Sequence, residues 1–207
     1  NDLLKKVLEA HGGLSRWSEI NQITAQMTIG GSFWEIKEQP HFFGEEKVEA
    51  DTRRQRIRLT SSSENERVID YDDESRRILV TGIGGKIIEE SFNPRLSFAG
   101  FNRMSKLNVS QAAYFISYSI WNYLTEPFLF TFPGFEIKEI EPWEELFQTW
   151  RRWLVKFPDT ISTHSPQQTF HYDDLGMLKR MDHEPMINGV PLVSLYAYYP
   201  KNFGGLV

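Results

Sequence analysis

Hydrophobic and polar residues alternate along most of the chain after its first twenty residues. In residues 20–29, Ile23, Ala25 and Met27 alternate with polar neighbours, which is the period of a strand with one buried and one exposed face. The same period predicts further strands at 32–38, 46–51, 54–60, 66–71, 77–81, 86–91, 135–141, 146–157, 167–173, 177–183 and 192–199. Strands at this regular spacing favour a large antiparallel sheet over alternating strand and helix units.

Two segments have the longer period of a helix. Residues 2–11 place their apolar side chains on one face, and Gly12 and Gly13 end this helix. We expect Ser110 to cap a second helix at 111–124. That helix is apolar nearly all round, so more than one of its sides must be covered. The sheet is therefore expected to curl around it.

These elements predict an α+β fold that is mainly β: a large curled antiparallel sheet, an open half-barrel, that encloses two or three helices. A short turn or helix at 93–101 precedes the apolar helix. No linker or low-complexity segment divides the chain, so residues 1–207 are expected to form a single half-barrel domain. The chain stops at Val207, where an apolar run begins, and we expect the C-terminal strand to be truncated there.

Composition argues against several classes of protein. Of 207 residues, 23 are Lys or Arg and 28 are Asp or Glu, and this acidic balance argues against a nucleic-acid partner. The absence of cysteine excludes disulfides, thiolate zinc sites and cysteine nucleophiles. No run approaches the length of a membrane-spanning helix, about 20 apolar residues, so no transmembrane segment is expected. The first residues lack the features of a signal peptide, which favours the cytoplasm; a periplasmic location stays open if a signal was removed.

Histidine and serine provide the candidates for catalysis or metal binding. His171 and His183 fall on neighbouring predicted strands, with Asp173 close by. This set could hold a metal ion, but cross-strand histidines without a ligand are the favoured interpretation. His164 precedes Ser165, yet adjacent residues of an extended segment point to opposite sides, and the chain has no nucleophile elbow. We therefore assign no catalytic residue, metal ligand or cofactor.

Two charged motifs have structural interpretations. Residues 82–86 resemble a phosphate loop, but no Ser or Thr follows the lysine, so a hairpin turn is favoured. Arg54, Arg56 and Arg58 alternate along one predicted strand, and the strand before it is acidic. An ion-pair ladder between these strands is favoured over a site for an anionic headgroup or peptide.

Aromatic residues suggest a binding site. Phe, Trp and Tyr make up 14% of the chain, and many fall on the apolar helix and on the strands expected to surround it. A single ring most often fills a core, whereas a collection of rings with a few hydroxyl and N–H groups also suits a cavity for an elongated apolar ligand. The residues expected to line this cavity are Tyr114, Tyr118, Trp121, Phe128, Phe130, Trp150 and Tyr172.

Several short motifs together carry a family resemblance. They include the segments 10–14, 94–100, 121–125, 141–143, 150–152, 163–165, 170–173 and 182–183. These motifs are spread over nearly the whole chain, and in them the sequence resembles a group of uncharacterised bacterial proteins. More distantly, the order of an N-terminal helix, many antiparallel strands, midchain helices and terminal hairpins is similar to the LolA/LolB-type lipoprotein carriers.

The carrier resemblance implies an open half-barrel with helices on its concave side and an acyl-chain or lipoprotein ligand. The chain departs from that pattern in having neither a visible signal peptide nor a lipobox cysteine. The resulting hypothesis is a noncatalytic binding or carrier protein for a hydrophobic small molecule, lipid or acyl chain. Two alternatives stay open: a hydrolase that uses His164 or His171 with Asp173, and an interaction module that uses an exposed sheet edge.

Overall fold

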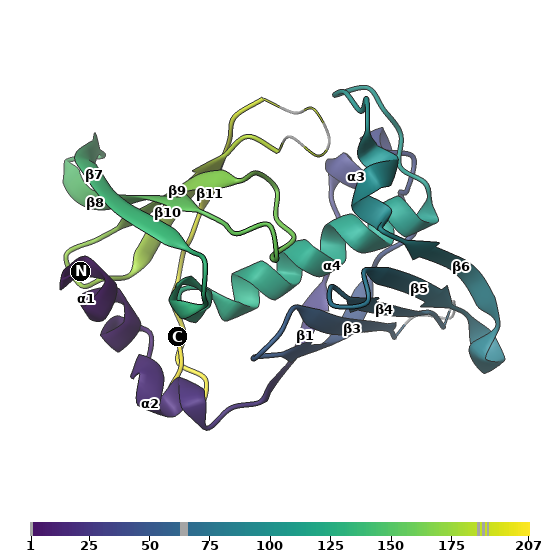
Figure 1. Cartoon of the computed structure of the whole chain (residues 1–207), viewed down its shortest axis with the longest axis horizontal. Coiled ribbons are helices and arrows are strands. Elements are labelled where there is room, and N and C mark those ends of the chain that lie inside the picture. The colour runs from purple at the N-terminus through teal and green to yellow at the C-terminus, as the bar shows by residue number, and fades with distance from the viewer. Residues whose placement is uncertain (1, 63–65, 186, 188, 190) are drawn as a thin grey trace.

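Two antiparallel sheets lie on either side of a long helix in the computed structural model (Figure 1). The structure describes residues 2–62, 66–185, 187, 189 and 191–207. The N-terminal sheet consists, in spatial order, of β1 (Gln22–Thr28), β2 (Glu45–Asp51), β3 (Arg56–Ser61), β4 (Val68–Asp72), β5 (Arg77–Thr81) and β6 (Ile87–Phe92). The C-terminal sheet has the order β11 (Val193–Tyr196), β10 (Leu178–His183), β9 (Gln167–Tyr172), β8 (Gln148–Lys156) and β7 (Glu136–Glu145).

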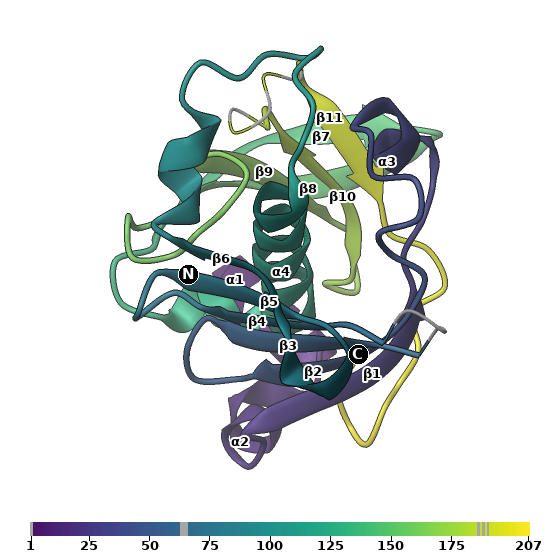
Figure 2. The same cartoon turned by 90° about the vertical axis from the view of Figure 1, so that its right-hand side faces the viewer.

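Helices fill the space between the sheets and cover one end of the molecule. The α-helices are α1 (Asp2–Ala10), α2 (Gly13–Ser18), α3 (Ser32–Ile36) and the long α4 (Val109–Thr125), and the 3₁₀ turns are η1 (Ile83–Gly85), η2 (Pro94–Phe98) and η3 (Phe128–Thr131). Figure 2 shows α4 nearly end-on, with one sheet on each side of it. In the part of the chain that the structure describes, no helix is long and apolar enough to cross a membrane.

The predicted fold class is confirmed: the protein is α+β, mainly β, with antiparallel strands that enclose a helix. Each strand pairs with its neighbours in sequence, so each sheet is a meander. The residues between β6 and β7 include α4 and interrupt this meander. As a result the strands form two sheets instead of one continuous sheet, and the sheets do not close into a barrel.

Alternation along the strands directs apolar side chains toward α4. Val48, Leu59, Ile69 and Val80 are register partners across β2 to β5 and have no exposed surface. Residues two apart on a strand share a face, so the neighbours of these residues along each strand point to the opposite side. Burial of this apolar row against α4 is the main force that holds the N-terminal sheet to the helix.

The opposite face of the N-terminal sheet carries ion pairs. Arg58 Nε lies 2.7 Å from Asp70 Oδ1 on β4, and Arg54 Nε lies 3.5 Å from Asp51 Oδ2. Of the expected ladder, the pair between Arg54 and Asp51 is present, whereas Arg58 pairs with Asp70 on the strand that follows it and Glu46 pairs with Arg67. The side chains of the Arg54 and Arg58 pairs are partly exposed, so water and salt screen these pairs and each contributes little to the free energy of unfolding.

The start of α4 differs by two residues from the prediction. Asn108, not Ser110, is the N-cap: its side chain accepts a hydrogen bond from the Gln111 backbone N–H at 2.8 Å. The Gln111 side chain in turn accepts one from the Asn108 N–H at 2.9 Å, which completes a capping box. Ser110 lies inside the first turn and is buried.

Two segments predicted as extended are helical. The predicted strand at 32–38 is replaced by α3, where the adjacent rings of Phe33 and Trp34 both pack on Phe115 of α4. Adjacent residues of a strand point to opposite faces, so a strand could not place both rings on the same helix. The stretch after α4, where Phe128, Phe130 and Phe132 alternate as on one face of a strand, forms η3, which also buries the intervening Leu129 with Phe128 and Phe130.

Candidate functional site

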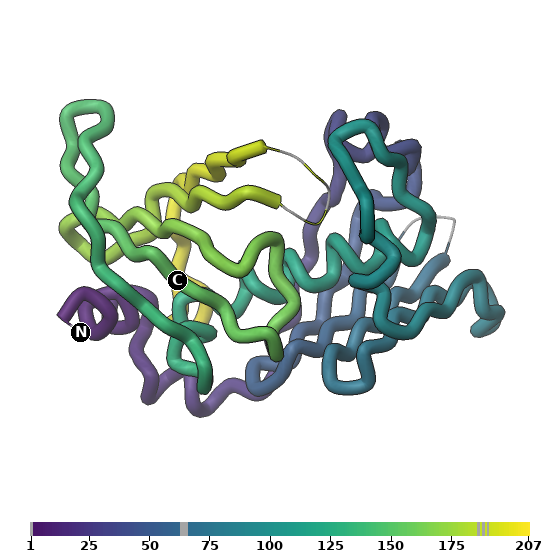
Figure 3. The backbone as a smooth tube through the Cα atoms, turned by 45° about the horizontal axis from the view of Figure 1, so that its top comes forward, coloured from purple at the N-terminus to yellow at the C-terminus, as the bar shows by residue number. Residues whose placement is uncertain are grey.

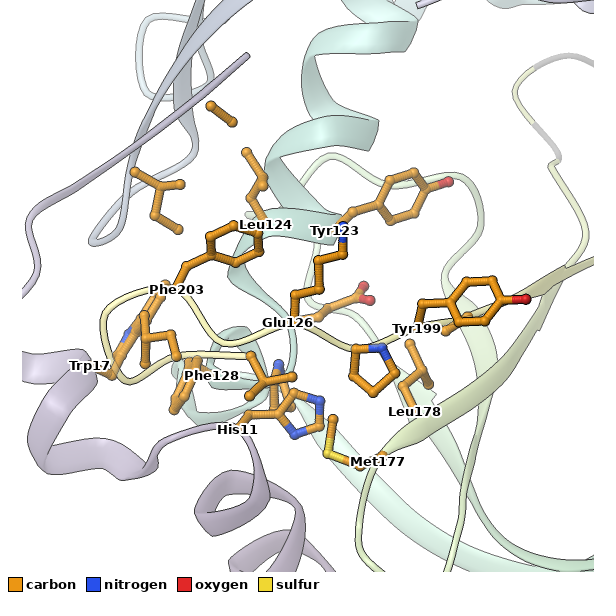
Figure 4. Close-up of a pocket in the computed structure, with 18 of the residues that line it drawn as sticks. His11, Trp17, Tyr123, Leu124, Glu126, Phe128, Met177, Leu178, Tyr199 and Phe203 are labelled. Atoms are coloured by element: carbon orange, nitrogen blue, oxygen red, sulfur yellow. The ribbon is translucent and has the colours of Figure 1, made fainter. Parts of the chain in front are cut away.

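A cavity of about 940 Å³ lies between β1, an edge of the N-terminal sheet, and β10 and β11 of the C-terminal sheet (Figure 4). Its remaining walls come from the end of α4 with η3, from α1 and α2, and from residues 197–207, which we call the C-terminal segment. Pockets that bind small molecules commonly have volumes of roughly 300–1,000 Å³. The cavity is therefore large enough for a sizeable small molecule.

Most of the wall of the cavity is apolar. Trp17 of α2 and Phe128 of η3 stack face to face, with ring centroids 4.4 Å apart and planes 6° apart. Ile23 and Ala25 share one face of β1 and contribute to the wall from the N-terminal sheet, and Met181 of β10 does so from the other side. Such a surface favours an apolar occupant over water.

The C-terminal segment contributes to the wall of the cavity. It ends beside the N-terminal helices (Figure 3). Arg16 of α2 donates a hydrogen bond from Nε to the Gly204 carbonyl oxygen at 2.8 Å. The Val207 N–H donates to the His11 carbonyl oxygen at 3.3 Å. These contacts hold the segment in place at the wall of the cavity.

Gly12 lies where the C-terminal segment meets α2. Its φ is +111°, in the left-handed region, and a Cβ atom at this position would lie 2.2 Å from the carbonyl oxygen of Gly205. Only glycine satisfies both the backbone conformation and the close approach. The Gly12–Gly13 pair, which the sequence suggests as a helix end, is thus also the docking point of the C-terminal segment.

Glu126 places a carboxyl group among the apolar lining. Pro127 disfavours the helical conformation in the residue before it, so Glu126 adopts an extended conformation at the end of α4 and its side chain lies in the cavity (Figure 4). Among the described residues its carboxylate has no hydrogen-bond or ion-pair partner. Burial raises the pKa of Glu126 well above its ordinary value, because an apolar environment disfavours the charged form.

A buried network of tyrosine and histidine adjoins the cavity through Tyr123, which is 40% exposed and lines it. The Tyr123 hydroxyl lies 2.9 Å from His164 Nε2, and the Tyr118 hydroxyl lies 3.0 Å from His164 Nδ1. Burial, with His183 and Arg95 nearby, lowers the pKa of His164 well below its ordinary value. A neutral imidazole has one donor and one acceptor nitrogen, so one tyrosine donates to the ring and the other accepts from it.

The residues expected from the sequence to line a cavity divide into two groups. Phe128 and Tyr172 do line this one. The other five are buried and lie outside its lining: Tyr114, Tyr118, Trp121, Phe130 and Trp150. The reason is that both sheets cover α4, whereas the cavity lies beside the end of that helix. Sequence reasoning therefore missed Glu126 and Trp17; the proline after Glu126 was the available signal that this side chain leaves the helix.

The core position of the helix residues is supported by their polar groups, which are bonded inside the protein. The Tyr114 hydroxyl donates to Ser162 Oγ at 3.0 Å, and Trp121 Nε1 donates to the Asp51 carbonyl oxygen at 2.7 Å. Buried polar groups normally require such partners. These side chains are thus satisfied without a ligand.

The histidines considered for catalysis or metal binding do not form such a site. His171 Nε2 lies 3.7 Å from Asp182 Oδ2, while the Asp173 carboxylate accepts hydrogen bonds from the backbone of its own hairpin turn. Among the described residues, the hydrogen-bond partners of the His164 ring are the hydroxyls of Tyr118 and Tyr123. Within the described ranges, no group of three or more His, Asp or Glu side chains could hold a metal ion.

Comparison of the chain with protein-family models, with curated proteins and with solved structures finds no significant match.

Proposed function

We propose that the protein is a noncatalytic binding or carrier protein for an elongated hydrophobic ligand, such as a lipid or acyl chain. The observation that carries this proposal is the 940 Å³ cavity with a mostly apolar wall. An empty apolar cavity of this size exposes hydrocarbon and aromatic surface to water, and an apolar occupant removes that surface from water. The distant resemblance to LolA/LolB-type carriers suggests the same class of ligand.

The mouth of the cavity supports the proposal. Tyr198, Tyr199 and Phe203 lie on the C-terminal segment and are 72%, 86% and 74% exposed. Large exposed rings beside an apolar pocket are typical of a binding surface. The same rings would cover a bound chain from the solvent side.

The two alternative functions have weaker support. A hydrolase would need a nucleophile or an activated water near His164 or His171, and the hydrogen-bond partners found for these rings are tyrosine hydroxyls and a backbone carbonyl. An interaction module would use a free sheet edge, and β1, one such edge, borders the cavity. A ligand in the cavity accounts for the apolar wall as well as the open edge.

Binding of Nile red, a neutral apolar dye, tests the proposal, together with native mass spectrometry of the protein as purified. In the variant Ala25→Phe the new ring projects from the inner face of β1 into the cavity. We expect it to weaken dye binding at least tenfold without lowering the unfolding temperature. Thr28→Phe is the matched control, because Thr28 is exposed on the same strand outside the lining. Failure of the native protein to bind the dye or to retain any lipid would contradict the proposal.

A further inference from the structure

The cavity contains an acidic group that an acyl chain alone does not explain. Glu126 lies among the labelled lining residues in Figure 4, with its carboxylate near the centre of the group. Tyr123 and Tyr172 are close enough for the charge of Glu126 to raise their pKa values further. A carboxyl group in an apolar pocket destabilises the folded protein when no protein group pairs with it, unless a ligand provides the hydrogen-bond or ionic partner.

His11 also contributes a hydrogen-bond acceptor to the wall. His11 donates from Nδ1 to the Val7 carbonyl oxygen at 2.8 Å, which leaves its Nε2 as an acceptor. Burial lowers the pKa of His11, so this ring is neutral. The titratable and charged groups that line the cavity besides Glu126 are His11, Tyr123, Tyr172, Tyr196, Tyr198, Tyr199 and Lys201. Lys201 is exposed, and in the described part of the chain no ion pair joins it to Glu126.

Aromatic rings complete the surroundings of the acid. Trp17, Phe128 and Tyr172 lie on the wall and Phe203 on the C-terminal segment. The faces of such rings that no other ring covers attract cations, most strongly where water is excluded. A carboxylate, hydroxyl acceptors and aromatic faces together form the environment that an organic ammonium group prefers.

We propose that the ligand is an amphipathic amine, whose ammonium head pairs with Glu126 and whose apolar body fills the remaining cavity. This inference rests on the proposed function and names the head group of its ligand. A fatty acid fits less well, because its carboxylate would bring a second negative charge to Glu126. A neutral lipid would leave the carboxyl group without a charged partner.

The proposal predicts the direction in which pH changes binding. Because burial raises the pKa of Glu126, the neutral acid is favoured in the empty site, whereas pairing with an ammonium group favours the ionised form and releases a proton. The association constant for an amine therefore increases with pH, by up to about tenfold per pH unit, until Glu126 is ionised in the empty protein. A neutral head group gives no such dependence, and a carboxylic acid gives the opposite one, because it ionises in solution as the pH rises.

Displacement of Nile red by dodecylamine, dodecanol and dodecanoate, each below its aggregation concentration, tests this between pH 5.5 and pH 8. We expect dodecylamine to bind at least tenfold more tightly than dodecanol at pH 8 and to be the only one whose affinity rises with pH. Glu126→Gln should remove both effects, so that this variant binds dodecylamine no more tightly than dodecanol at either pH. Glu141→Gln, an exposed carboxylate on β7 outside the cavity, should bind all three as the native protein does.

The possible failures are distinguishable. Equal affinity for amine and alcohol, or an amine affinity that Glu126→Gln leaves intact, would overturn the amine inference while the carrier function stands. Tighter binding of dodecanoate would overturn it in favour of an acidic ligand. If neither Nile red nor any of the three compounds binds, the proposed function fails and the inference fails with it.

Discussion

The imidazole rings of His164 and His183 stack in the interior, with centroids 4.5 Å apart and planes 5° apart. Both rings are 4% exposed. His183 Nδ1 has no hydrogen-bond partner among the described residues. Two stacked imidazoles repel each other when charged, and burial disfavours the charged form further. The pair is therefore stable only while both rings are neutral.

This stacking predicts that acid destabilises the protein. Burial lowers the pKa of His183 from 6.5 to about 4, with Asp182 opposing the shift. Between these values the unfolded chain binds more protons at this residue than the folded protein does, so stability decreases as the pH falls from 6.5 toward 4. The loss attributable to this group is about 3 kcal/mol. Urea unfolding at pH 7, 6, 5 and 4.5 measures it.

The variant His183→Phe isolates this contribution. A phenyl ring keeps a stacking partner for His164 and cannot be protonated, so we expect the decrease in stability between pH 6.5 and pH 4.5 to become smaller. His41→Phe is the control, because His41 is exposed and its replacement should leave the pH dependence unchanged. An unaltered pH dependence in His183→Phe would show that the stacked pair is not responsible.

A buried ion pair in the N-terminal sheet gives a second prediction. Arg67 pairs with Glu46, which has no exposed surface, and the guanidinium carbon lies 4.3 Å from the ring centre of Phe42. Arg67→Met removes the partner of a buried carboxylate, a change that costs about 3–5 kcal/mol of stability at pH 7. The double variant with Glu46→Gln should recover most of this loss.

The pH dependence of Arg67→Met provides an independent check. Burial raises the pKa of Glu46, and Arg67 opposes the shift; without Arg67 the pKa is higher still. The folded variant therefore binds a proton that the unfolded chain releases above about pH 4.5, so its stability should increase as the pH is lowered toward that value. Chemical denaturation measures the free energy of unfolding of the native protein and of Arg67→Met at pH 7 and at pH 5. The stability lost in the variant should be smaller at pH 5, and an equal loss at both pH values would argue against this mechanism.

Much of the fold follows from alternation along the chain, and the exceptions are local. The buried row from Val48 to Val80 follows from the alternation of apolar and polar residues along the strands. The long helix follows from a segment that is apolar nearly all round. The helix α3 is different, because Phe33 and Trp34 adopt their positions in response to Phe115, more than eighty residues away in the sequence. A local pattern contains no information about such a contact.

The position of the cavity was harder to predict than its aromatic character. The sequence indicates rings around the helix, but whether a ring is packed or faces open space depends on where the sheets end. Trp121 and Phe128 are both buried, but Phe128, seven residues later, lines the cavity and Trp121 does not, because α4 stops between them at Thr125. Glu126 has no distinguishing sequence pattern apart from the proline that follows it.

Trp121 and Leu195 separate these two roles experimentally. Trp121→Ala removes a fully buried ring and its hydrogen bond to Asp51, so it should lower the free energy of unfolding by about 3–5 kcal/mol with little change in Nile red affinity below the unfolding temperature. Leu195 lines the cavity and is 38% exposed. Leu195→Ala should therefore weaken Nile red binding and change the free energy of unfolding little. Thermal unfolding and dye titration of both variants test this, and a large loss of affinity in Trp121→Ala would place the ligand against α4 instead.

The contact between Gly12 and Gly205 predicts that adding a methyl group at Gly12 loosens the C-terminal segment and opens the cavity. Gly12→Ala introduces backbone strain of about 1–3 kcal/mol at a left-handed position and also collides with the Gly205 carbonyl oxygen. Gly13 is the matched control: its φ is +79°, but a Cβ atom there meets nothing within 4 Å. Both alanine variants therefore carry strain, and only Gly12→Ala should displace the C-terminal segment.

We expect faster hydrogen exchange of residues 197–207 and faster Nile red release in Gly12→Ala, since local opening increases exchange. Equal changes in the two variants would show that backbone strain, and not the contact, accounts for the effect.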